Sequence, residues 1–339
     1  MDEITSSIRK KRSKPITLLT WSGVALLTPA SLAWVLGRWS YWFDMVAAQQ
    51  MLIGWIALAI AILILISRRQ AQGTICLLLA VVSLYPTLTA RNWLLPHVDP
   101  NHKPDGVIRI VSCNINPENL SWQEDLDLLL SLNADVVILI ELPIELNRSV
   151  RKRGLLDMTE YQNWAHRAWV DMETSPGFIL SKWPMHRVET GFDPDNSQHH
   201  LYMQIQNPLG NLVVGLAHPL SPRTTSRWAN GNQVVESHAN AAFLIEKNLQ
   251  LPVVVGADLN AGPGQVRART LRRTGLRMSK PVIRYGASFP SGSSFPRAVR
   301  LQLDDIWTIG EITPISWDMI QLQDSDHMAV VVDCVLNSR

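Results

Sequence analysis

Hydrophobic residues follow two different patterns along this chain of 339 residues. Positions 16–90 contain three long apolar runs, at 16–36, 46–66 and 74–90, with Asp44 as the single acidic residue. From position 107 onward, short apolar runs typical of buried strands alternate with stretches that repeat apolar residues at helical spacing. These patterns predict an apolar N-terminal region and a C-terminal domain that mixes strands and helices.

The three apolar runs are candidates for transmembrane helices. About 20 apolar residues are needed to cross a bilayer, and the first two runs reach this length, whereas the third is shorter and contains Pro86. A buried helix of a soluble domain is the alternative for the third run. The first run has the basic flank of a signal peptide, but its apolar part exceeds the usual core of about 7–15 residues. We therefore predict an anchor of three transmembrane helices.

Basic residues in the short loops predict the orientation of this anchor. The tail at positions 1–15 is strongly basic, and the loop at 67–73 carries Arg68 and Arg69. The positive-inside rule places both in the cytoplasm. Three crossings then put the C-terminal domain outside the cytoplasm, in the periplasm of a Gram-negative cell, whereas two crossings leave it inside. We expect a multi-pass protein of the bacterial inner membrane with an extracytoplasmic domain.

Positions 91–106 connect the two regions and contain Pro96, Pro100 and Pro104 among polar residues. This composition predicts a stiff, extended linker, followed by the domain at 107–339. Two stretches in that domain, 122–132 and 234–249, repeat apolar residues at helical spacing and precede strand-like runs.

The charge of the C-terminal domain narrows the choice of binding partners. From position 100 onward there are 22 Lys and Arg against 25 Asp and Glu, a net charge of −3, which disfavours nonspecific binding of duplex DNA. A cluster of five arginines is the exception and forms either a phosphate-facing patch or a solvated helix face: Arg267, Arg269, Arg272, Arg273 and Arg277.

Cys113 and Cys334 on predicted strands either pair or, as we favour, are buried free thiols.

Polar residues follow several apolar runs of the C-terminal domain. The run at 108–113 leads into Asn114, the run at 135–140 into Glu141, and the run at 212–217 into His218. Further along, the chain carries an Asp-x-Asn sequence, an Asp pair and an Asp-His pair: Asp258 and Asn260, Asp304 and Asp305, Asp326 and His327. Side chains at strand ends converge at one edge of a sheet, where a metal and a phosphate can be bound.

This order of residues resembles the endonuclease/exonuclease/phosphatase superfamily over positions 106–336. The resemblance implies a four-layered α/β sandwich, here preceded by the three transmembrane helices, and metal-dependent hydrolysis of phosphate esters. It also implies Glu141 and Asp326 as metal ligands, with Asn114 holding Glu141 or ligating through water. Mg²⁺ or Mn²⁺ is the expected cofactor, because hard divalent cations take oxygen ligands.

The resemblance also assigns roles to the Asp-x-Asn sequence. Asp258 orients the attacking water, and Asn260 hydrogen-bonds a phosphoryl oxygen. Alternation along a strand puts residues i and i+2 on one face, so both side chains can address one phosphate. The alternative reading is an Asx-turn, which is compatible with the first.

Two histidines complete the implied site. His327 exchanges protons, with Asp304 bound to its other ring nitrogen at ~2.6–3.2 Å. Asp305 points the opposite way along a strand and is the second choice. The Asp304 carboxylate should raise the pKa of His327 unless desolvation dominates.

His218 contacts the phosphate and protonates the leaving oxygen. Its carboxylate partner is not identified from the sequence, although Glu173 is nearby. Arg223 and Arg227 follow closely and are expected to bind phosphate bidentately.

The sequence thus predicts a membrane-anchored, Mg²⁺-dependent phosphoester hydrolase without an obligate protein partner. The substrate is a phosphodiester or phosphomonoester, whether in nucleic acid, a lipid headgroup or a small molecule. The superfamily resemblance does not choose between a nuclease, a phosphatase and a lipid phosphodiesterase. A degenerate member that only binds phosphate ligands is the non-enzymatic alternative.

Overall fold

The computed structural model describes residues 20–89, 92–144, 146, 166–170, 176–188, 201–284, 287–292, 296 and 299–337. The chain divides into two compact units. One comprises residues 1–89 with 263–266, and the other comprises residues 90–262 with 267–339. The basic tail expected at 1–15 and residues 16–19 of the first apolar run lie outside the described residues.

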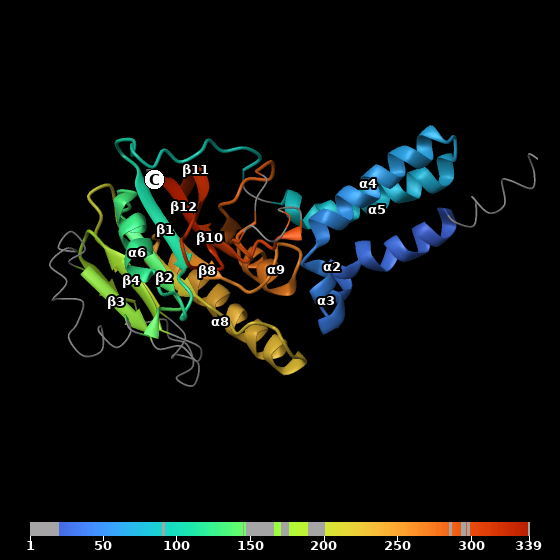
Figure 1. The fold of residues 1–339 in the computed structure, drawn as a ribbon. Coiled ribbons are helices and arrows are strands. Elements are labelled where there is room, and N and C mark those ends of the chain that lie inside the picture. The colour runs from blue at the N-terminus through green and yellow to red at the C-terminus, as the bar shows by residue number, and fades with distance from the viewer. Residues whose placement is uncertain are drawn as a thin grey trace, which may run out of the picture. The chain divides into compact units, whose positions relative to one another are not determined.

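Helices make up the described part of the N-terminal unit (Figure 1). A helical stretch over Thr20–Leu36, which ends in α2 (Ala33–Leu36), bends by 105° into α3 (Tyr41–Ala47). Then follow α4 (Gln50–Ile66) and α5 (Gln70–Leu88). Helices therefore cover most of the described residues of the three apolar runs, with a turn at residues 48–49 inside the second.

Among the described residues, fewer helices have the length needed to span a membrane than the three we expected. Only α5 is long and apolar enough to cross a membrane by itself, and the bent pair Thr20–Leu36 plus Tyr41–Ala47 qualifies if it counts as one span. Helix α4 has 17 residues, or ~25 Å at 1.5 Å per residue. The described residues thus contain one or two helices of spanning length, because bends and short loops interrupt the apolar runs.

The described residues of the second unit, 90–262 with 267–339, form two mixed sheets of six strands each (Figure 1). The first has the order β11-β12-β1-β2-β4-β3 and the second the order β5-β6-β7-β8-β10-β9. The strands of the first sheet are β1 (Ile108–Asn114), β2 (Val136–Ile140), β3 (His166–Val170), β4 (Gly177–Ser181), β11 (Ile312–Gln321) and β12 (Met328–Leu336). Those of the second are β5 (Met185–Arg187), β6 (Leu201–Ile205), β7 (Leu212–Ala217), β8 (Val253–Asp258), β9 (Arg277–Met278) and β10 (Asp304–Ile309).

Three apolar cores hold the layers together. Inward-facing residues such as Ile110, Ile138 and Val254 form the core between the sheets. A second core lies between the first sheet and α6 (Trp122–Ser131). The third lies between the second sheet and two helices, α8 (Thr225–Leu249) and α9 (Val266–Arg273). This order of helix, sheet, sheet and helix is the α/β sandwich that the resemblance implied, and period-2 alternation along the strands explains it.

Strand directions bring the polar strand ends to one edge. Strand β1 runs parallel to β2, and β7 runs parallel to β8, so Asn114, Glu141, His218 and Asp258 follow or end strands that point the same way. Strands β10 and β12 are antiparallel to these, with Asp304 opposite Asp258. Strands β10 and β12 therefore contribute to this edge the residues at or just before their first positions, Asp304 and His327.

Residues 92–98 of the expected linker pack onto the second unit. Leu95 and Val98 are buried. The Val282 and Ile283 amides donate to the Asn92 and Trp93 carbonyls at 3.0 and 2.9 Å. The three cysteines are buried and none of them forms a disulfide, as we favoured for Cys113 and Cys334.

A buried ion pair joins β1 to β12. The Arg109 guanidinium donates through Nε to Asp333 Oδ1 at 2.7 Å and through Nη2 to Oδ2 at 3.1 Å. Its Nη1 also donates to the Leu132 carbonyl at 2.8 Å. Both side chains are shielded from water, so removing one partner leaves an uncompensated buried charge.

We expect Asp333→Ala to destabilise this unit by about 3–5 kcal/mol, measured as a loss of unfolding free energy in the full chain. Replacing both residues, as Arg109→Met with Asp333→Leu, should restore most of the loss. Asp318→Ala removes the solvent-exposed pair with His97 and is the matched control, with an expected cost below about 1 kcal/mol. A loss in Asp333→Ala as small as in the control would contradict the assignment.

Candidate active site

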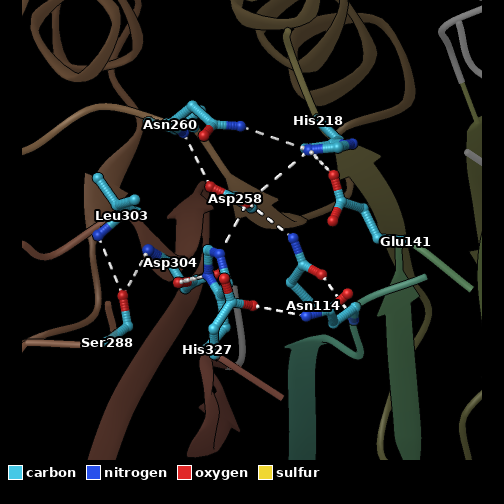
Figure 2. A network of polar contacts seen from close by, with 12 residues as sticks. Asn114, Glu141, His218, Asp258, Asn260, Ser288, Leu303, Asp304 and His327 are labelled. Atoms are coloured by element: carbon cyan, nitrogen blue, oxygen red, sulfur yellow. Dashed lines mark hydrogen bonds and ion pairs between the residues drawn. The ribbon is translucent and has the colours of Figure 1, made fainter. Parts of the chain in front are cut away.

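Asp258 lies at the centre of a network of polar side chains (Figure 2). Its Oδ2 accepts a hydrogen bond from Asn114 Nδ2 at 3.0 Å, and its Oδ1 accepts one from the Asn260 amide at 2.8 Å. The same Oδ2 lies 3.7 Å from His218 Nε2 and 3.9 Å from His327 Nδ1. Five of the residues predicted for the site therefore meet at this carboxylate.

These partners decide the charge of Asp258. Burial alone would raise the pKa of this carboxyl, but the charges of His327 and His218 outweigh it. The hydrogen bonds from Asn114 and Asn260 act in the same direction, so the pKa lies below its usual value. Asp258 is thus an ionised acceptor at neutral pH, although it is fully enclosed.

The expected pair of Asp304 and His327 is present, with Asp304 Oδ2 2.7 Å from His327 Nδ1. Burial would lower the pKa of the imidazole, but the carboxylates of Asp304 and Asp258 raise it to about 10. Burial also raises the pKa of Asp304. Ser288 Oγ accepts from the Asp304 amide at 3.0 Å, and the Phe289 ring packs 4.8 Å from the imidazole.

Asp305 points away from this pair, as strand alternation predicted. Its carboxylate accepts from the Lys280 amide and from Trp317 Nε1, both at 3.1 Å. Burial raises its pKa to about 7. Asp304 is therefore the residue that orients His327.

His218 has a carboxylate partner that the sequence did not identify. Glu141 Oε1 lies 3.3 Å from His218 Nε2. The odd-numbered residues Val137 and Leu139 of β2 face α6, and regular alternation would turn Glu141 to the same side. Its φ of +55° breaks this alternation. Glu173, the nearest candidate from the sequence, lies outside the described residues.

The alternation argument for Asn260 is wrong. Strand β8 ends at Asp258, and Asn260 has a φ of +48°. The hydrogen bond from its amide to Asp258 Oδ1 is that of an Asx-turn. The turn brings Asn260 Nδ2 to 3.2 Å from the Pro219 carbonyl and 3.4 Å from His218 Nε2.

Asn114 and Asp326 are connected through a residue that the sequence analysis missed. The Asn116 amide donates to Asn114 Oδ1 at 3.0 Å, and its Nδ2 donates to Asp326 Oδ1 at 3.1 Å. Asn116 has a φ of +73°. The sequence could have predicted this contact, because Asn116 follows Asn114 by two residues and an Asn side chain often accepts a hydrogen bond from the backbone two residues on.

Ser325 connects the same two segments. Its hydroxyl donates to the Asn114 carbonyl at 2.8 Å and accepts from the His327 amide at 3.0 Å.

The side chains whose ligand atoms lie close together differ from the metal ligands predicted from the sequence. Ligand atoms of Asp258, Asp304 and His327 all lie within 4.8 Å of one another, but this imidazole already forms an ion pair with Asp304. Glu141, Asp326 and Asn114 instead offer carboxylate and amide oxygens, which suit Mg²⁺ or Mn²⁺. Asp304 Oδ1 is also buried without a hydrogen-bond partner among the described residues. The donor chemistry of this edge fits a hard cation.

The two expected phosphate-binding arginines lie beside the site, at the beginning of α8. Arg223 and Arg227 are exposed. The Arg227 amide donates to Thr224 Oγ1 at 3.2 Å, which caps the helix.

Solved structures of several other proteins are similar to this chain. The structure of D. rerio TDP2 complexed with single strand DNA product has a TM-score of 0.50 at 14% identity, over 69% of this chain and 100% of that chain. The human Nocturnin catalytic domain with bound sulfate has a TM-score of 0.48 at 16% identity, over 70% and 97%. An endonuclease/exonuclease/phosphatase from Beutenbergia cavernae has a TM-score of 0.46 at 16% identity, over 68% and 72%.

No match was found among curated proteins. The family model described as the endonuclease/exonuclease/phosphatase family matches residues 119–327, which is more than half of the chain and includes most of the network around Asp258. The chain therefore belongs to the endonuclease/exonuclease/phosphatase family.

Proposed function

We propose that this protein is a membrane-anchored, Mg²⁺-dependent phosphoester hydrolase in which water attacks phosphorus in line. The observation that carries the proposal is the ionised, buried Asp258, with Asn114, Asn260 and two histidines around it. A carboxylate of low pKa that faces two imidazoles suits the transfer of protons between water and a phosphate ester.

Each group has a role that follows from its contacts. Asp258 accepts a hydrogen bond from the attacking water, because its negative charge persists at neutral pH. Asn260 Nδ2 lies near His218 and donates to a phosphoryl oxygen, while His218 protonates the leaving oxygen. His327 holds its proton and uses Nδ1 for Asp304, so its Nε2 is the nitrogen that interacts with phosphate.

The carboxylates of Glu141 and Asp326 would hold the metal, with Asn114 assisting. When bound, Mg²⁺ supplies positive charge that polarises the phosphoryl group and offsets charge in the transition state. The need for such a cation also follows from the charge of the site, where four carboxylates face two imidazoles: Glu141, Asp258, Asp304 and Asp326 against His218 and His327.

A lipid headgroup or small phosphodiester is the substrate class we favour over duplex DNA. Two of the five clustered arginines, Arg267 and Arg269, are only 1% and 9% exposed, which reduces the basic surface a nuclease needs. The unit instead exposes apolar residues where residues 92–93 pair with 282–283. Trp93, Leu94 and Ile283 are 58%, 69% and 64% exposed, and aromatic residues favour the membrane interface.

The first test measures hydrolysis with and without EDTA. Purified full chain should hydrolyse bis-p-nitrophenyl phosphate or phospholipid in Mg²⁺, with EDTA abolishing turnover and plasmid DNA a poorer substrate. Glu141→Ala should raise the Mg²⁺ concentration for half-maximal activity at least about 10-fold, while Asp318→Ala, a surface carboxylate, should not. Phosphate binding without turnover of any substrate would favour the non-enzymatic alternative.

The second test concerns the pH dependence of kcat. The carboxylates raise the pKa of His327 to about 10, so the imidazolium is lost only as pH rises through that value. In Asp304→Asn one of these charges is gone, the pKa falls, and the basic limb of the pH–rate profile should move to lower pH. We expect kcat at neutral pH to fall about 10²-fold. An unchanged basic limb would show that His327 does not act as the imidazolium.

The third test concerns localisation. With the tail and the 67–73 loop in the cytoplasm, an alkaline phosphatase fusion after Arg91 should be active and a fusion in that loop inactive. Activity of a cytoplasmic reporter after Arg91 would instead require an even number of crossings and place the catalytic unit inside the cell.

A further inference from the structure

Arg267 is buried beside the turn formed by Asp258, Leu259 and Asn260. Its Nη1 donates to the Leu259 carbonyl at 2.8 Å, and its Nε donates to Asn232 Oδ1 on α8 at 3.2 Å. It is 1% exposed. A guanidinium that is buried in this way cannot contact phosphate at the protein surface. Arg267 is therefore not part of the phosphate-facing patch that was one interpretation of the arginine cluster.

We propose that Arg267 is a positioning residue that fixes the peptide between Leu259 and Asn260 and thereby orients Asp258 and Asn260. This inference rests on the proposed hydrolytic role of those two residues. Arg267 itself lies behind the turn and acts through the peptide, without touching substrate.

The peptide unit in question is held at both of its polar ends. Its carbonyl, from Leu259, accepts from Arg267 Nη1, and its N–H, from Asn260, donates to Asp258 Oδ1 at 2.8 Å. A bond to a charged donor polarises the peptide and strengthens the N–H as a donor. Arg267 therefore supports the ionised form of Asp258 through one intervening peptide.

The same contact constrains Asn260. This residue has a φ of +48°, which is unfavourable for a side chain other than glycine and needs support from its surroundings. The Leu259 amide adds a further constraint by donating to the Leu303 carbonyl at 3.0 Å. With the peptide free to rotate, Asn260 Nδ2 would leave its place beside His218.

Gly231 on α8 provides the space that the guanidinium occupies. A Cβ at this position would lie 2.0 Å from Arg267 Nη2 and 2.7 Å from Cζ. The Arg267 side chain would have to move, and its bond to Leu259 would break. Gly231→Ala therefore perturbs the turn indirectly, from a residue outside the site.

A double-mutant cycle on the full chain tests the proposal, with kcat for bis-p-nitrophenyl phosphate as the readout. Arg267→Ala and Gly231→Ala should each lower kcat about 10²-fold, the effect of a small misplacement at a reacting centre, with KM changed much less. The double variant should match Arg267→Ala alone, because the alanine at 231 then has no guanidinium to displace. Additive losses, or a rise in KM with kcat unchanged, would overturn the proposal.

Hydrogen exchange provides a readout that does not depend on activity. In both single variants, amides of residues 258–262 should exchange about 5- to 10-fold faster, the equivalent of one net hydrogen bond. Arg273→Ala, an exposed arginine of α9, should change nothing. Arg109→Met, which removes a buried arginine bound to a different carbonyl, should lower stability without affecting this segment.

The two readouts separate the two proposals. If the wild type hydrolyses no phosphoester but the exchange of residues 258–262 responds to Arg267→Ala, the proposed function fails and the positioning of the turn stands. Unchanged exchange in this segment in both variants would exclude Arg267 as its support. Because alanine favours a helix more than glycine does, weakening of α8 would not explain an effect of Gly231→Ala.

Discussion

The hydrogen bond from Asn114 to Asp258 connects the two sheets at the edge where the site lies, and the other site contacts depend on it. Asn114 ends a strand of the first sheet and Asp258 ends a strand of the second. Gly256 allows this approach, since a Cβ there would lie 2.5 Å from Ile138 Cδ1 and 2.7 Å from Ser112 Oγ. A buried carboxylate is stable only with such partners, so the packing of the sheets and the ionisation of Asp258 have a common origin.

The sequence predicted those features that follow from strand direction and alternation. Apolar runs gave the strands, and polar residues at their ends gave the edge, because parallel strands bring their carboxyl ends together. The pairing of an aspartate with His327 came from the family resemblance, and strand alternation supported Asp304 over Asp305. The packing of helices on both outer faces came from the family resemblance, since periodicity indicates only a mixture of helices and strands.

Features that depend on the backbone leaving regular geometry could not be predicted. Glu141 and Asn260 both have positive φ, which is uncommon for residues other than glycine, although less so for Asn, and which places their side chains where alternation does not. The burial of Arg267 depends on the absence of a side chain at Gly231, 36 positions away in the sequence. The three expected spans were not all reproduced for a similar reason, because hydropathy records composition, whereas a turn at residues 48–49 divides the second apolar run.

The packing of residues 92–98 moves the beginning of the folded domain upstream of the expected boundary at residue 107. Leu95 and Val98 belong to the two cores on either side of the first sheet, and the Pro96 carbonyl accepts from the Trp317 amide at 3.2 Å. A polypeptide that started at residue 107 would leave two apolar sites open to water and the amides of three residues without acceptors. A second unit expressed without the N-terminal helices therefore has to begin at or before Asn92 to keep these contacts.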